Sequence, residues 1–164
     1  PCYVFAPIFN DLVTLERLDG SEVLNKTIEI IQGMIDEGKV DGNRIYVTGK
    51  SMGGSNTVRA MLEHPDFFAA GIPMCGTLDP DDIDITPLVG QKIWLVQNDG
   101  DNPKSVDRTT RLYNALKAAG SENAKIRLFT VKEMNVLGYD EYHAVDMQVH
   151  ANEIFYEWMF AQTK

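Results

Sequence analysis

The sequence predicts an α/β protein in which a mostly parallel sheet is flanked by helices. Short apolar runs alternate along the chain with amphipathic stretches of helical length. Such an alternation favours parallel strands joined by right-handed crossovers. Several apolar runs also lack polar alternation, which is typical of strands buried on both faces. Because the 164 residues contain no repeat and no convincing linker, we expect residues 1–164 to form a single domain.

In the first part of the chain, prolines, a glycine and a capping serine indicate where the expected elements begin and end. An apolar strand at residues 2–7 ends at a proline, and a loop covers residues 8–22. Ser21 can cap a helix that starts near Glu22, and Gly38 stops that helix. A strand at residues 44–48 leads into a helix at residues 51–64, which a proline closes.

The second part of the chain repeats this pattern. Residues 68–75 and 92–97 are continuous apolar runs, each expected to form a buried strand. A helix is expected at residues 104–119, where a glycine follows it, and a further strand at residues 125–131. An amphipathic helix at about residues 147–162 is expected to close the chain.

The most specific motif is Gly-x-Ser-x-Gly, formed by Gly49, Ser51 and Gly53 directly after the strand at residues 44–48. A serine on a sharp strand-to-helix turn is exposed to a substrate, and the glycines are expected where a Cβ atom would collide with the strand or helix. The motif in this context predicts a nucleophile elbow. A phosphate-binding loop is the rejected alternative, because Arg44 stands where that motif needs a glycine.

A serine nucleophile needs a base, and three histidines are available. His64 falls at a helix end, where a histidine commonly interacts with the helix dipole. His150 falls within the closing helix, whose side would turn it away from the strand ends. His143 lies in the loop after the last strand, which is where the base of such a site belongs. We therefore predict His143 as the general base.

The acid that orients the base is expected after the strand at residues 92–97. Two aspartates lie in that loop, and we predict Asp101 as the acid and Asp99 as a residue that shapes the turn. An acidic stretch offers a third possibility and suggests calcium, but its spacing lacks the glycine and glutamate of an EF-hand loop. A solvated loop with helix-capping aspartates is the preferred interpretation of its members, Asp79, Asp81, Asp82 and Asp84.

Composition excludes several classes of partner. The net charge of −9 argues against nucleic acid or an anionic membrane surface, and no apolar run is long enough to cross a membrane. Cys2 and Cys75 are too few for a disulfide scaffold or a zinc site, and both are expected to be buried free thiols. We expect neither a metal nor an organic cofactor.

These motifs resemble the α/β-hydrolase superfamily. The chain is most similar to predicted esterases related to feruloyl esterases, polyhydroxybutyrate depolymerases and the prolyl oligopeptidase group. The resemblance lies in the segments 41–54, 64–70, 73–76, 92–101 and 156–160. It implies an α/β-hydrolase fold, with Ser51 as nucleophile, Asp101 as acid and His143 as base. Relatives often carry His-Gly where this chain has Gln97 and Asn98.

The resemblance also implies a serine ester hydrolase that acts through an acyl-enzyme on a small or carbohydrate-linked ester. A serine peptidase and a non-catalytic, hydrolase-like binding protein are the alternatives. The Met52 N–H is expected to donate to the oxyanion, while the His-Gly-x-Gly sequence that often marks a second donor does not occur. Since Pro1 opens inside an expected strand, we expect N-terminal strands upstream. The resemblance favours secretion over a cytoplasmic location; oligomeric state is left open.

Overall fold

A parallel sheet forms the centre of the computed structural model, which describes residues 2–8 and 19–164. The chain divides into two compact units, residues 1–42 and 43–164. Organisation as a single domain stays a prediction. The sheet and its flanking helices lie in the second unit, and they confirm the expected α/β class with a parallel sheet between helices.

In the first unit, the helix α1 spans Asp19–Asp36. It starts earlier than expected, so Ser21 lies within the helix and is not its cap. Its C-terminal end is as expected: Gly38 has a φ of +70°, and the N–H groups of Gly38 and Lys39 donate back to Ile35 and Met34. The expected loop at residues 8–22 lies mostly outside the described residues.

The expected strand at residues 2–7 is wrong. These residues have no regular structure and are exposed, with no strand partner in the described part of the chain. Apolar content alone does not make a strand, because an unpaired strand leaves its backbone groups without hydrogen-bond partners. Cys2 is therefore exposed, which corrects the expectation of a buried thiol, whereas Cys75 is buried as expected.

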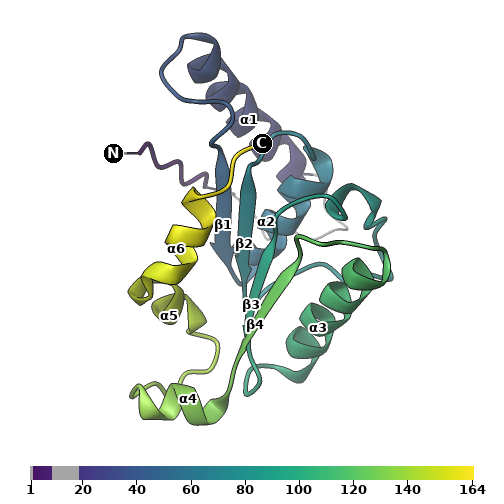
Figure 1. The fold of residues 1–164 in the computed structure, drawn as a ribbon, viewed down its shortest axis with the longest axis vertical. Helices are drawn as coiled ribbons and strands as arrows, with labels where there is room; N and C mark the ends of the chain where they lie inside the picture. The colour runs from purple at the N-terminus through teal and green to yellow at the C-terminus, as the bar shows by residue number, and fades with distance from the viewer. Residues whose placement is uncertain (1, 9–18) are drawn as a thin grey trace. The chain divides into compact units, whose positions relative to one another are not determined.

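In the second unit, four parallel strands lie in the order β1-β2-β3-β4 (Figure 1). Their bounds are Tyr46–Lys50, Ala70–Met74, Trp94–Asn98 and Lys125–Phe129. Because all four strands are parallel, their C-terminal ends lie at the same edge of the sheet. The residues expected to carry the chemistry, after β1, β3 and β4, are thus gathered at that edge.

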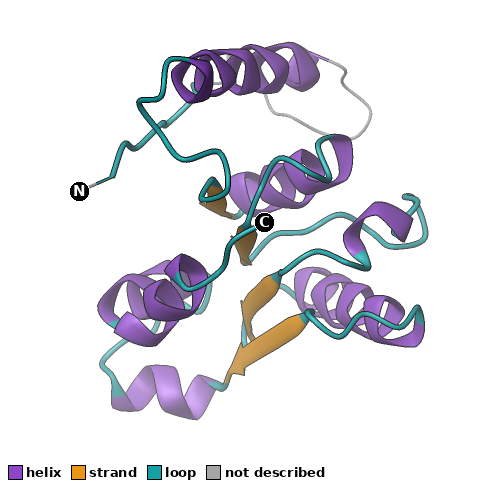
Figure 2. Ribbon diagram, turned by 45° about the horizontal axis from the view of Figure 1, so that its top comes forward, coloured by secondary structure: helices purple, strands orange, loops and turns teal. Residues whose placement is uncertain are grey.

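Helices cover both faces of this sheet. On one face lie α2 (Met52–Glu63) and α3 (Pro103–Ala118), with buried Met61 and Leu112 (Figure 1). The opposite face carries α5 (Val145–Ala151) and α6 (Glu153–Phe160), as Figure 2 also shows. Their core with the sheet is formed by Ala70, Ile72, Met74, Val96, Phe129, Val145, Val149, Phe155 and Met159. A short 3₁₀-helix, Thr86–Leu88, lies between β2 and β3.

Two expectations near the C-terminus need correction. The strand expected at residues 125–131 ends at Phe129, because Thr130 caps the helix α4 (Val131–Val136). Thr130 and Glu133 form a reciprocal capping box, a sequence signal that could have predicted this helix. The closing helix is two helices, since Asn152 adopts an extended conformation and its side chain caps α6 through the Ile154 N–H.

Candidate active site

Ser51 occupies the turn between β1 and α2 with a φ of +56° and a ψ of −117°. A non-glycine residue in such a sparsely populated conformation costs on the order of 1–3 kcal/mol, and the surrounding contacts must maintain it. One of them is the Ser51 N–H, which donates to the Met74 carbonyl at 2.8 Å. The turn has the strained backbone that a nucleophile elbow needs.

Close packing requires glycine at only one of the two positions in the motif. A Cβ atom on Gly49 would lie 2.4 Å from the Gly53 backbone, as expected for the approach of strand and helix. A Cβ on Gly53 would meet open space, so the expectation of a collision there is wrong. The second tight position is Gly54, whose Cβ would lie 2.6 Å from the Gly76 carbonyl oxygen. The sequence motif does not include it.

The structure brings the predicted acid and base together. His143 Nδ1 lies 2.9 Å from Asp101 Oδ2, although 42 positions separate the two residues. The Asp101 side chain is only 7% exposed and that of His143 is 37% exposed, so the pair is reached from the histidine side. With Nδ1–H donating to the carboxylate, Nε2 is the lone-pair nitrogen left to accept a proton.

The serine is not joined directly to this pair. In the described part of the chain, the Ser51 hydroxyl makes no hydrogen bond to either side chain. The catalytic roles of Ser51, Asp101 and His143 stay predictions, for which the acid–base contact provides the geometry. Contacts of this kind often tighten only when a substrate is bound.

The turn before Asp101 is built by the two residues that depart from the family pattern. The Gln97 side chain bonds Ser105 and accepts the Asn98 N–H at 2.9 Å. Asn98 in turn accepts the Gly100 N–H at 2.7 Å through its side chain. Both Gln97 and Asn98 are fully buried. Gln97 and Asn98 therefore stabilise the loop that carries Asp101.

The loop that carries His143 is attached to its surroundings at both ends. A Cβ on Gly100 would lie 2.9 Å from the Tyr142 ring, so this ring packs directly on the acid loop. Beyond the histidine, Asp146 pairs with Lys50 at 2.9 Å, and Lys50 precedes the serine. The backbone N–H of His143 donates to the Glu141 carboxylate at 3.0 Å.

The alternative bases and acids lie elsewhere. His64 is the C-cap residue of α2, and His150 bonds the Tyr156 hydroxyl through Nδ1. Asp99 accepts the Val131 N–H at 2.7 Å and so joins the acid loop to the start of α4. His150 thus contacts a tyrosine and not one of the candidate acids.

Part of the acidic stretch forms a surface network of ion pairs. Asp79 and Asp81 both pair with Arg111. The N–H of Asp81 lowers the pKa of the Asp79 carboxyl, and Arg111 acts in the same direction. Asp84 accepts the Thr86 side-chain and backbone donors, which lower its pKa as well.

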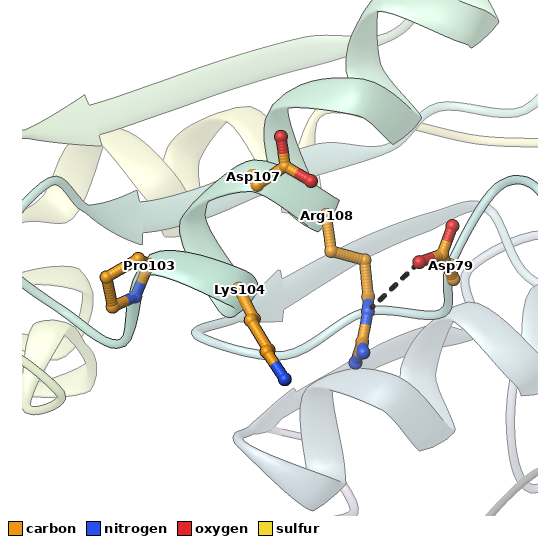
Figure 3. A pocket seen from close by; sticks show the side chains of 5 residues that line it. All are labelled: Asp79, Pro103, Lys104, Asp107 and Arg108. Atoms are coloured by element: carbon orange, nitrogen blue, oxygen red, sulfur yellow. Dashed lines mark ion pairs between the residues drawn. The ribbon is translucent and has the colours of Figure 1, made fainter.

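A shallow pocket of about 300 Å³ lies where this network meets the start of α3 (Figure 3). Its lining residues are Asp79, Pro103, Lys104, Asp107 and Arg108. Arg108 Nε lies 3.8 Å from Asp79 Oδ2, so opposite charges largely satisfy one another there. One lining residue, Pro103, lies two positions after Asp101, but neither Ser51 nor His143 lines the pocket.

Met52 is the first residue of α2, where an N–H group has no acceptor within the helix. This placement suits the predicted oxyanion donor, whose role stays a prediction. The positive end of the helix dipole at this position also favours a developing negative charge.

Cys75 is the residue of this region that sequence reasoning missed. Its thiol, the Asp101 carboxylate and the His143 ring each present a ligand-type atom, all within 4.8 Å of one another. In this structure the Asp101 and His143 side chains contact each other at 2.9 Å. Burial and the Asp101 charge raise the pKa of the Cys75 thiol from 9.0 to about 12. The sequence signal that could have indicated Cys75 was its position between a buried strand and Gly76.

Comparison with known proteins shows that the chain is similar to hydrolases. The model of the prolyl oligopeptidase family matches residues 12–108. A thermostable esterase structure is 31% identical with a TM-score of 0.77; the match covers 87% of this chain and 37% of that one. No curated protein sequence matches the chain significantly.

Two further structures share the fold at lower identity. An acylaminoacyl peptidase of Pyrococcus horikoshii is 20% identical with a TM-score of 0.59, over 85% of this chain and 27% of that one. A bacterial esterase is 17% identical with a TM-score of 0.53, over 84% and 42% of the respective chains. This chain thus spans less than half the length of each of these matched structures.

Proposed function

The chain belongs to the prolyl oligopeptidase family of the α/β-hydrolase superfamily, and we propose that it is a serine ester hydrolase acting through an acyl-enzyme. The 2.9 Å contact between His143 Nδ1 and Asp101 carries this proposal. It leaves Nε2 as the proton acceptor, while Ser51 occupies a strained elbow after β1. A histidine oriented by a buried carboxylate is what a serine hydroxyl needs to become a nucleophile.

In the proposed reaction, Ser51 Oγ attacks the acyl carbonyl while His143 Nε2 removes its proton. The Met52 N–H donates to the oxyanion, and Asp101 stabilises the imidazolium that forms. His143 then protonates the leaving alcohol, which departs as the acyl-enzyme forms. A water molecule, activated by the same nitrogen, releases the acid and restores Ser51. None of these steps needs a metal or an organic cofactor.

An ester is the preferred substrate because the similarity to a thermostable esterase is greater than that to an acylaminoacyl peptidase, in identity and in TM-score. We propose a small or carbohydrate-linked ester as its class. A serine peptidase is the second candidate, which the family match supports. A hydrolase-like protein without catalysis is the third, because a second oxyanion donor has not been identified.

The experiment compares the protein with its Ser51→Ala variant on a short-chain aryl ester. Ser55→Ala is the matched control, because Ser55 lies on the same helix but bonds the Thr77 carbonyl at 3.2 Å. We expect Ser51→Ala to lose turnover and Ser55→Ala to keep it. Undiminished turnover by Ser51→Ala would refute the proposal.

Two companion measurements separate the other candidates. Short acyl-peptide anilides, assayed beside the ester, would be cleaved with comparable kcat/KM by a peptidase. A fluorophosphonate probe should label Ser51 in either enzyme, because the probe requires an activated serine. A folded protein with no label at Ser51 would identify the non-catalytic alternative.

A further inference from the structure

The turn from Met74 to Gly76 lies between the predicted nucleophile and the predicted acid. On one side, the Met74 carbonyl accepts the Ser51 N–H at 2.8 Å. On the other side, the Cys75 thiol faces the Asp101 carboxylate. The backbone between them is fixed to the sheet, since the Cys75 N–H donates to the Val96 carbonyl at 2.9 Å. One short turn therefore supports two parts of the site.

Cys75 keeps a side chain in a conformation that favours glycine. Its φ is +48°, and of the described non-glycine residues only Ser51 shares a positive φ. A left-handed conformation costs an ordinary residue roughly 1–2 kcal/mol, which glycine would avoid. Strain of this kind is concentrated at functional sites, so the thiol itself is the feature that needs an explanation.

The surroundings of the sulfur supply that explanation. Cys75 is 3% exposed, and the polar neighbours of its thiol include the Asp101 carboxylate, a ring nitrogen of His143 and the backbone N–H of Val145. Because burial and the Asp101 charge raise the pKa of the thiol, it stays neutral and has an S–H group to donate, with a carboxylate oxygen of Asp101 within 4.8 Å. Val145 begins α5, two residues after His143. The sulfur thus lies between the acid and the segment that carries the base.

We propose that Cys75 is a positioning residue of the acid–base pair. Its S–H group donates to the Asp101 carboxylate, and its sulfur accepts the Val145 N–H. This holds the carboxylate against His143 Nδ1 and fixes the start of α5 relative to the acid. The inference rests on the proposed function, since Cys75 acts only through Asp101 and His143.

The test uses three substitutions that separate the donor from the strain. Cys75→Ser keeps a donor, Cys75→Ala removes it and keeps the strain, and Cys75→Gly removes both. We expect Cys75→Ala and Cys75→Gly to lower kcat by about twofold to tenfold, the range for a hydrogen bond of ordinary strength, with little change in KM. Cys75→Ser should stay within about twofold of the parent protein.

A second readout reports charge, which a purely structural role would not change. Without the thiol donor, the Asp101 carboxylate attracts the imidazolium more strongly. The acid limb of kcat/KM should therefore move to higher pH in Cys75→Ala but not in Cys75→Ser. The other charged groups near the pair are unchanged in these variants: Lys50, Asp146 and Glu141.

A third readout does not depend on turnover. The proton on His143 Nδ1 should give a low-field NMR signal in the parent and in Cys75→Ser, and should exchange faster with water in Cys75→Ala. If Ser51 takes no fluorophosphonate label but this signal depends on the donor, the proposed function fails and the positioning role stands. Normal kcat, pH profile and proton exchange in Cys75→Ala would overturn the inference, as would a Cys75→Ser variant as impaired as Cys75→Ala.

Discussion

Gly76 packs against the backbone of Ser51 so closely that a Cβ atom on Gly76 would lie 1.9 Å from the Ser51 carbonyl oxygen. Because the backbone of Gly76 packs on the backbone of Ser51, a shift of either residue would change the conformation of the elbow. The conformation of the predicted nucleophile therefore depends on a glycine 25 positions later in the chain.

The first prediction follows directly. Gly76→Ala should lower the free energy of unfolding by about 2 kcal/mol or more and abolish ester turnover, because the added methyl group displaces the elbow. Gly53→Ala is the control: its Cβ meets open space within a helix, where alanine is favoured over glycine by about 0.5–1 kcal/mol. Urea unfolding of both variants checks this. Equal losses of stability would contradict the packing described.

The second prediction separates the two aspartates of the acid loop. Asp101→Asn should lower kcat by roughly 10³-fold to 10⁴-fold, because an amide no longer stabilises the imidazolium or selects its tautomer. Asp99→Asn should keep most of kcat, because the amide oxygen of asparagine can still accept the Val131 N–H that Asp99 accepts. Steady-state kinetic measurements decide the matter. A larger loss of kcat in Asp99→Asn would reverse the assignment.

The third prediction concerns acid stability. The Thr130 N–H and Arg127 lower the pKa of Glu133 from 4.5 to about 2. A carboxyl with a lowered folded-state pKa stabilises the fold above its unfolded pKa and loses this contribution as the pH falls towards the folded value. Glu133→Gln should therefore be less stable at pH 7, by less than about 1 kcal/mol because the side chain is exposed to solvent. The difference should shrink between pH 4.5 and pH 2.

Denaturant unfolding of the two proteins at several pH values measures this difference. Lys132→Gln is the control, since it changes a neighbouring charge outside the capping box. If the difference between Glu133→Gln and its parent grew on acidification, the stabilising role of the Glu133 carboxylate would be contradicted.

The fourth prediction uses the two thiols. Burial holds the pKa of Cys75 at about 12, so almost no thiolate is present at neutral pH, whereas Cys2 is exposed. An aromatic disulfide reagent should therefore titrate one thiol in the native protein and two after denaturation. Cys2→Ser should leave no fast-reacting thiol. A fast reaction of Cys75 in that variant would show that the acid–base pair is open to solvent from the cysteine side.

Much of the fold was predictable because its signals are local. The apolar runs at β2 and β3 mark buried strands, and Gly49 and Ser51 mark the elbow between β1 and α2. The contact between Asp101 and His143 was predictable too, since parallel strands bring the loops that follow them to one edge.

What could not be predicted depends on contacts between distant segments. The packing of Gly54 and Gly76 arises where β2 ends beside the elbow, and no local pattern shows that proximity. The role inferred for Cys75 likewise depends on Asp101, in the loop after β3, and on Val145, at the start of α5. The break at Asn152 was missed for another reason: the apolar period continues across it, while its capping side chain interrupts the helix.

The attachment of the His143 loop has a consequence for how such a site can change. Tyr142 is held on the acid loop at Gly100, and Asp146 is held by Lys50 beside the serine. Residues 136–138, 140 and 141, which precede Tyr142, are exposed and take no part in either anchor. Substitutions in the exposed stretch before Tyr142 can therefore alter what the site accepts while the base keeps its place.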